Sequence, residues 1–324
     1  MTHRQCSDFF VASCVDDGGV YHYRLYDDGK TEMNRRIEMP SPMYMCLEKD
    51  NLYAVLRSPF DESDESGIVS LDTNTWELKQ GVISTLGQVG CHIAVDKRDI
   101  YCANYISGSV FKSPSGLSVH QGHGTDPKRQ NSPHVHSVVF SKDKKYLLSC
   151  DLGLDTVFVY DRNLNLVSKA KVPMGAGARH LVISNNGDFV YCVNEMGGSV
   201  TSFSFDNGRL NYCDNLSIVP DDFVGTPSGA AIKLSKDGKR LYVTERASQS
   251  IIVLSVMGER LSVIARVDCR GKEPRDFTLL SDERFAVCTN QFSDSVALFK
   301  MEENGIPHYL NSIDIPAPLC AVER

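Results

Sequence analysis

The chain has 324 residues, a formal net charge of −7 at pH 7 and no block rich in lysine or arginine. Proteins that grip a nucleic-acid backbone need a basic patch, so we expect no nucleic-acid partner, although a few converging arginines can still bind a small anion. No run approaches the roughly 20 apolar residues of a membrane span, so we expect no membrane partner either.

Strand-turn-strand units follow one another along the chain at intervals of roughly 45 residues. Weak copies lie near residues 9–38, 43–86 and 88–125. Clear copies follow at 137–151, 181–194 and 231–245, and a last weak copy lies near 273–315. Their β-branched and aromatic runs are joined by Asp-Gly-like or Asn-Gly-like turns, which is typical of β-hairpins. No helical periodicity of useful length interrupts them.

Seven such units predict an all-β fold, a seven-bladed β-propeller of four-stranded antiparallel blades, with residues 1–324 as a single domain. The segment 313–323 repeats the segment 37–48, which leads into an innermost strand. The first unit begins at Ser7 without such a strand. We therefore expect the C-terminal strand to join the first blade and close the ring, which hides the sheet edge.

Ionisable residues recur at two fixed positions of the repeat. The second strands end at equivalent residues, which are Asn104, Asp151, Asn194, Glu245 and Asn290. Fifteen residues before these stand Val89, His136, Arg179, Ala230 and Arg275. Directly after them stand Tyr105, Leu152, Glu195, Arg246 and Gln291, and Arg57 is expected at the same place in the second unit.

Equivalent positions of a propeller lie at the same height around its axis. We therefore expect one end of the channel to gather His136, Arg179, Glu195, Arg246 and Arg275. A single Arg or Glu at a strand end is usually solvated or ion-paired. Five ionisable groups in register are harder to explain in this way, because buried charge costs stability unless it is paired or meets a ligand.

No metal or cofactor is expected. His134 and His136 share one strand face by spacing, but no third ligand stands at a matching position. The segment from Asp151 to Asp155 lacks the ligand pattern of a calcium-binding EF-hand loop and is better interpreted as a turn. The eleven cysteines form no C-x-x-C pair.

The cysteines and the N-terminus indicate the compartment. Cys102, Cys192 and Cys288 each precede the asparagine that ends a second strand by two residues, so we expect small buried hydrophobic residues. Free thiols fit a reducing compartment. The first residues show no basic and apolar pattern of a signal peptide, so we expect a cytoplasmic protein.

Several short sequence segments resemble those of the seven-bladed lactonase family. They are Pro133-His-Val-His-Ser with Asp151-Leu-Gly-Leu-Asp, Ala178-Arg-His-Leu with Val193-Asn-Glu, Thr244-Glu-Arg, and Glu273-Pro-Arg-Asp-Phe with Asn290-Gln. The family includes cycloisomerase-2 type 6-phosphogluconolactonases and fungal carboxy-muconate cyclases. The resemblance covers nearly the whole chain and implies a site made of His136, Arg179, Glu195 and Arg246. Thr244-Glu-Arg stands where Ser-Asn-Arg is usual, so we expect Glu245 to add a carboxylate beside Arg246.

Ring opening by water needs a general base and donors for the oxyanion that develops. Glu195, or His136 if neutral, can be the base, and Arg179 and Arg246 can hold the oxyanion and a substrate anion. Arginines lower the pKa of a neighbouring carboxylate and weaken it as a base, which favours His136. The residues expected to bind substrate are Arg275, Gln291, Tyr105 and Arg57.

The resemblance implies hydrolysis of a small anionic lactone, such as 6-phosphogluconolactone of the pentose phosphate pathway. Two alternatives stand beside it. A cycloisomerase that forms a lactone from a dicarboxylic acid could use the same arginines. A non-catalytic binding scaffold is possible because a fold does not determine a function, and it predicts an exposed apolar patch at a channel mouth.

Overall fold

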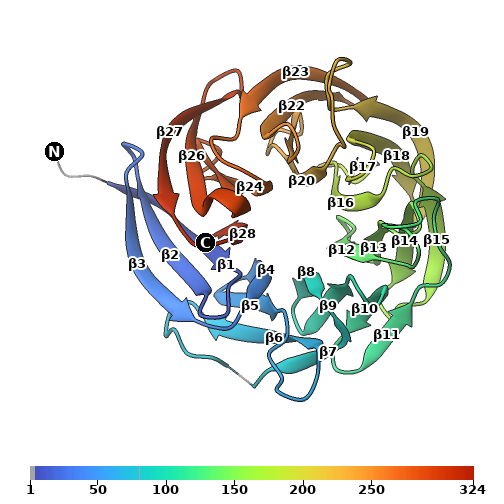
Figure 1. Ribbon diagram of the computed structural model, residues 1–324, viewed down its shortest axis with the longest axis horizontal. Coiled ribbons are helices and arrows are strands. Elements are labelled where there is room, and N and C mark those ends of the chain that lie inside the picture. The colour runs from blue at the N-terminus through green and yellow to red at the C-terminus, as the bar shows by residue number, and fades with distance from the viewer. Residues whose placement is uncertain (1–3, 80) are drawn as a thin grey trace.

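The computed structural model describes residues 4–79 and 81–324 and places their strands in seven four-stranded antiparallel sheets around a central channel (Figure 1). The predicted seven-bladed all-β propeller is confirmed. We number the blades in chain order, with blade 1 containing the first strand of the chain. Within the described residues the helical structure is one 3-10 turn, η1 (Gln291–Ser293).

Each blade is built from the channel outwards, and its strands are given in that order. Blade 1 contains β28 (Pro318–Glu323), β1 (Gln5–Ser13), β2 (Gly19–Tyr26) and β3 (Thr31–Glu38). Blade 2 contains β4 (Pro42–Glu48), β5 (Asn51–Leu56), β6 (Glu65–Asp72) and β7 (Ile83–Gln88). Blade 3 contains β8 (Gly90–Asp96), β9 (Asp99–Asn104), β10 (Ser109–Lys112) and β11 (Gly116–Val119).

The later blades repeat this order. Blade 4 contains β12 (Val135–Phe140), β13 (Tyr146–Asp151), β14 (Thr156–Asp161) and β15 (Leu166–Lys171). Blade 5 contains β16 (Ala178–Ile183), β17 (Phe189–Asn194), β18 (Ser199–Asp206) and β19 (Arg209–Ser217). Blade 6 contains β20 (Gly229–Leu234), β21 (Arg240–Glu245), β22 (Ser250–Met257) and β23 (Arg260–Asp268). Blade 7 contains β24 (Pro274–Leu280), β25 (Phe285–Asn290), β26 (Ser295–Met301) and β27 (Pro307–Asp314).

The two ends of the chain meet in blade 1. Strand β28 pairs antiparallel with β1, so that Val11 lies opposite Ala321. The hydroxyl of Ser7 donates to Oε1 of Glu323 at 2.6 Å. The expected closure by the C-terminal strand is therefore confirmed, and it supplies the innermost strand that the first repeat lacks.

The hydrophobic core is divided among the interfaces between blades. Between blades 4 and 5, Leu148 and Val159 pack with Leu181 and Ile183. Between blades 7 and 1, one cluster includes Phe9. This arrangement is why a single blade cannot bury both of its faces alone and why the ring must close.

A β-bulge lies at the second residue of every innermost strand. The bulged residues, which have no partner on the neighbouring strand, are Met43, Cys91, His136, Arg179, Ala230 with Ala231, Arg275 and Leu319. A bulge turns a side chain away from the regular alternation of the strand. The bulge therefore determines which side chain each blade directs toward one end of the channel.

A second ring of residues follows the second strand of each blade. Its members are Cys14, Arg57, Tyr105, Leu152, Glu195, Arg246 and Gln291, and each backbone N–H donates to the carbonyl two residues before the bulge of its own blade. Their acceptors are Ala317, Ser41, Val89, His134, Gly177, Ser228 and Glu273, in the same order. These shared hydrogen bonds hold the two rings at one height.

Candidate active site

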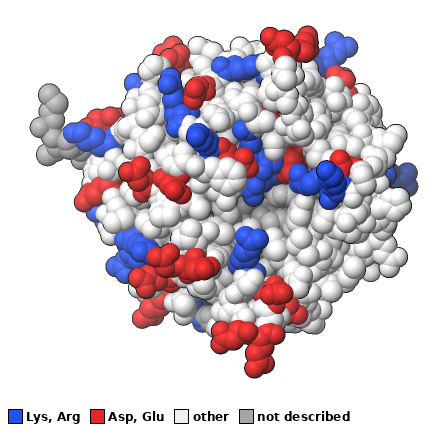
Figure 2. All heavy atoms as spheres, viewed as in Figure 1, with Lys and Arg blue, Asp and Glu red and all other residues white. Residues whose placement is uncertain are grey.

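The two rings enclose a cavity of about 370 Å³ at one end of the channel. Its lining includes seven of the eight predicted site residues, namely His136, Glu195, Arg246, Arg275, Gln291, Tyr105 and Arg57. The eighth, Arg179, is buried behind Glu195 and contacts it directly. Figure 2 shows basic side chains around the central hollow of one face of the propeller. The predicted convergence of these residues is thus observed.

Glu195 lies at the centre of an arginine cluster. Its Oε2 accepts a hydrogen bond from Nε of Arg179 at 3.1 Å and lies 3.0 Å from Nη2 of Arg246. Its Oε1 accepts a hydrogen bond from Nη2 of Arg129 at 2.5 Å. Burial raises the pKa of Glu195, but the charges of Arg246 and Arg179 outweigh it and hold the pKa well below its usual range. The carboxylate is therefore ionised, with both oxygens engaged.

The two buried arginines have further partners that fix their orientation. Nη1 of Arg179 donates to the carbonyl oxygen of Ala230 at 2.7 Å. Arg246 donates from Nε to the carbonyl of Ser228 at 3.2 Å and from Nη1 to Oε1 of Glu273 at 2.9 Å. These bonds join blades 5, 6 and 7 across the cavity wall.

Positive charge exceeds negative charge around this cavity. Arg275 lies 3.7 Å from Glu273, and burial with the charge of Arg246 lowers the pKa of Arg275. The four lining guanidinium groups belong to Arg57, Arg129, Arg246 and Arg275, and the one lining carboxylate belongs to Glu195. Such a cavity favours a ligand that carries negative charge.

The imidazole of His136 forms one side of the cavity. Its Nδ1 lies 3.8 Å from Sγ of Cys91. The ring meets Tyr105 and His180 edge to face, with centroids 5.3 Å and 5.2 Å apart. Burial, and then the charge of Arg179, lowers the pKa of His136 well below its usual value. The histidine is therefore neutral and has a nitrogen lone pair at neutral pH.

The imidazole of His134 packs against Tyr105. Its ring stacks on Tyr105 with centroids 4.5 Å apart, and its Nδ1 lies 3.1 Å from the carbonyl oxygen of that residue. Over the ranges 4–79 and 81–324, no group of three or more His, Cys, Asp or Glu side chains is placed to hold a metal ion. The turn predicted after Asp151 is confirmed, because Oδ1 of Asp151 accepts from the N–H of His134 and of Leu154.

Two predictions from the sequence were wrong. Val89 borders the cavity, but the blade 3 equivalent of His136 is Cys91, because the β8–β9 hairpin is shorter. Glu245 adds no carboxylate to the cavity lining. Its side chain is buried and accepts hydrogen bonds from the backbone N–H of Ser228 and of Ser248, each at 2.5 Å. It closes the turn after β21.

Two charged residues of the candidate site were not predicted from the repeat. Arg129 lies on the connection between β11 and β12, which is longer than the connections between the other blades, so the repeat spacing could not identify it. Glu273 stands two residues before Arg275, the bulge residue of blade 7 that the repeat spacing did identify. Its backbone has a φ of 59°, in the left-handed region.

The chain belongs to the seven-bladed β-propeller lactonase family, whose model matches residues 8–323. It is 29% identical over 334 residues to the 6-phosphogluconolactonase of Bacillus subtilis, with 93% of each chain covered. It is 32% identical over 326 residues to an uncharacterised protein of Lactococcus lactis subsp. cremoris, again with 93% of each chain covered.

A solved structure supports the same assignment. The periplasmic gluconolactonase of Pseudomonas aeruginosa superposes with a TM-score of 0.90 at 27% identity and covers 98% of both chains. Among the described residues of the present chain, no helix is long and apolar enough to cross a membrane. The family and the cavity together define a lactonase-type propeller.

Proposed function

We propose that this protein hydrolyses a sugar lactone that carries an anionic group, such as 6-phosphogluconolactone, in the cavity around Glu195. The observation that carries the proposal is the excess of guanidinium groups over carboxylates in that cavity. Arginines bind phosphate and carboxylate oxygens in pairs and stabilise negative charge on a carbonyl oxygen. The relationship to the B. subtilis 6-phosphogluconolactonase supports the same substrate class.

His136 is proposed as the general base. Arg179 and Arg246 hold Oε2 of Glu195, and their charges keep the pKa of this carboxyl well below its usual range, so Glu195 is a weak base. The neutral imidazole of His136 borders the same cavity and has an available lone pair. The imidazolium that forms is stabilised by the charge of Glu195, whose presence raises the pKa of His136. Protonated His136 then returns the proton to the leaving ring oxygen.

Arg129 is proposed to bind the substrate anion directly. Its side chain is 47% exposed, whereas those of Arg179 and Arg246 are 3% and 7% exposed. It can therefore move from Glu195 to an incoming anion with little desolvation cost, while Arg179 and Arg246 continue to hold Oε2 of Glu195. Arg57 and Arg275, which line the cavity from blades 2 and 7, are proposed to hold another part of the substrate.

The proposed function is tested by proton release from freshly prepared lactones. The protein is expected to accelerate ring opening of 6-phosphogluconolactone above the spontaneous rate and to act more slowly on the uncharged gluconolactone. No acceleration with any lactone of a panel would refute hydrolysis. Lactone formation from a dicarboxylic acid, measured in parallel, would favour the cycloisomerase instead.

A reducing compartment, such as the cytoplasm, is part of the proposal. All eleven cysteines are free thiols. Sγ of Cys150 lies 3.6 Å from Sγ of Cys192 without a bond between them. Disulfides are rare where thiols are kept reduced, so the free pair supports this location.

A further inference from the structure

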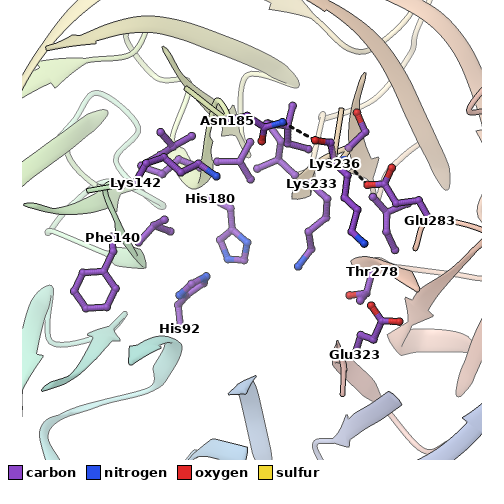
Figure 3. Close-up of a pocket in the computed structure, with 18 of the residues that line it drawn as sticks. His92, Phe140, Lys142, His180, Asn185, Lys233, Lys236, Thr278, Glu283 and Glu323 are labelled. Atoms are coloured by element: carbon purple, nitrogen blue, oxygen red, sulfur yellow. Dashed lines mark hydrogen bonds between the residues drawn. The ribbon is translucent and has the colours of Figure 1, made fainter. Parts of the chain in front are cut away.

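A second cavity of about 580 Å³ opens at the other end of the channel (Figure 3). It shares no lining residue with the cavity around Glu195. The rings of His136 and His180 stand between the two, with centroids 5.2 Å apart. The volume falls in the range of small-molecule binding sites.

Residues from all seven blades line this second cavity, and its apolar wall comes from four consecutive blades, 4 to 7. The apolar side chains belong to Val139, Phe140, Leu181, Val182, Ile183, Ile232, Leu234 and Leu279. Polar side chains converge on the space that these residues enclose. This combination of an apolar wall with a few directed polar groups is typical of a ligand site.

Two histidines at the floor have ring nitrogens without partners. Nε2 of His180 and Nδ1 of His92 are buried, and no hydrogen-bonding group of the described residues reaches them. His180 itself is 7% exposed, and Figure 3 shows both rings directed toward the centre of the cavity. Burial lowers the pKa of His92 to about 3 and that of His180 well below its usual value, so both rings are neutral. Buried polar atoms of this kind normally have partners.

One ammonium group points into the same space. Nζ of Lys233 lies 3.2 Å from Oδ1 of Asp276. Burial lowers the pKa of Lys233, but the charge of Asp276 outweighs it and keeps the lysine protonated. An ammonium has three donors, and Figure 3 shows this side chain extending toward the histidines. The remaining donors are therefore available to a ligand.

The charges at the rim limit the charge of that ligand. Lys142 and Lys236 lie there with Glu283 and Glu323, and Lys236 also pairs with Asp282. Of these groups, Lys142 is exposed and forms no ion pair within the described residues. The lining contains three lysines and two glutamates, so it can balance at most one negative charge on a ligand.

We propose that this second cavity is a binding site for a small monoanionic hydroxy acid. Its carboxylate would meet Lys233, with Lys142 nearby. Its hydroxyl groups would meet the ring nitrogens of His92 and His180, because a hydroxyl can donate or accept and so fits either tautomer of a neutral histidine. The carbon chain would lie against the apolar wall. The inference depends on this cavity alone and not on lactone hydrolysis.

The test measures glycerate binding by the imidazole NMR signals of His92, which does not border the arginine-rich cavity. Glycerate has no lactone ring, so turnover does not intervene. We expect a saturable shift, and propionate, which lacks hydroxyl groups, is expected to bind at least about tenfold more weakly. A folded protein without a glycerate response, or one that binds inorganic phosphate more tightly than glycerate, would overturn the proposal.

Two variants separate a site from a general charge effect. Lys142→Glu, and the double variant Lys233→Met with Asp276→Asn, are each expected to weaken glycerate binding by at least about tenfold. The double variant leaves no unpaired buried carboxylate. Lys169→Glu, on the outermost strand β15, is the matched control and is expected to bind as the parent does. Unchanged affinity in both test variants would contradict the assignment.

Discussion

Nη2 of Arg246 lies 3.0 Å from Oε2 of Glu195, although the two residues belong to different blades. Both side chains are buried, at 7% and 6% exposure. Each stands directly after the second strand of its blade, where its N–H bonds to the carbonyl two residues before the bulge. Their contact therefore depends on adjacent blades being packed in register.

Replacing Glu195 should damage both stability and activity. In Glu195→Gln, Arg179 and Arg246 lose their shared carboxylate, and breaking a buried ion pair from one side costs about 3–5 kcal/mol of unfolding free energy. Lactone hydrolysis should fall by about 10²-fold or more. Chemical denaturation and proton-release kinetics measure these changes. Glu302→Gln, at an exposed site, is the control, and a variant as stable as the parent would contradict the pairing.

Replacing Arg129 should mainly weaken substrate binding. If Arg129 grips the substrate anion, Arg129→Ala raises KM by about tenfold or more, while kcat changes less. Because Arg129 is half exposed and buried Glu195 keeps its contacts with Arg179 and Arg246, the fold should remain stable. Lys128→Ala, the exposed neighbour, should leave both constants unchanged. A collapse of kcat with unchanged KM would instead place Arg129 in the chemical step.

His136 and Glu195 can be separated by kinetics. If His136 is the base, His136→Gln should lower kcat by about 10²-fold or more with little change in KM and a folded protein. His123→Gln, at an exposed histidine, should have no effect. Full activity of His136→Gln together with an inactive but folded Glu195→Gln would transfer the role of base to the carboxylate.

Buried neutral histidines predict a loss of stability in acid. Folding lowers the pKa of His92 to about 3, and those of His136 and His180 are also lowered. The unfolded chain takes up protons on these groups below about pH 6.5, and the folded chain does not. The free energy of unfolding should therefore be highest above about pH 6.5 and fall as the pH drops toward the folded values.

His92→Phe tests this pH dependence directly. Phenylalanine keeps the stacking of His92 on Tyr44, where the ring centroids are 4.3 Å apart, and removes the titrating group. Below about pH 6, the slope of unfolding free energy against pH should decrease by about 1.4 kcal/mol per pH unit. This decrease corresponds to one proton fewer taken up on unfolding. Urea denaturation at several pH values measures it. An unchanged slope would mean that His92 is protonated in the folded protein.

The repeat made most of the candidate site predictable. His136, Arg179, Glu195, Arg246 and Arg275 were found because hairpins of equal length keep equivalent residues at a constant spacing. The spacing failed where hairpin length changes, as it does at Cys91 in blade 3. Arg129 could not be found in this way, because it lies on an irregular connection where residues do not recur at the repeat spacing.

The sequence by itself determined the number of blades, the closure by the C-terminal strand and the two rings of residues. These features follow from local patterns of alternation and turns, which recur at a fixed period. Only the tertiary structure decided that Arg179 lies behind Glu195, that Arg129 reaches the cavity from a loop, and that a second cavity opens beside His180. These relationships depend on how separate blades and connections pack in three dimensions, and no local pattern of residues encodes such distances.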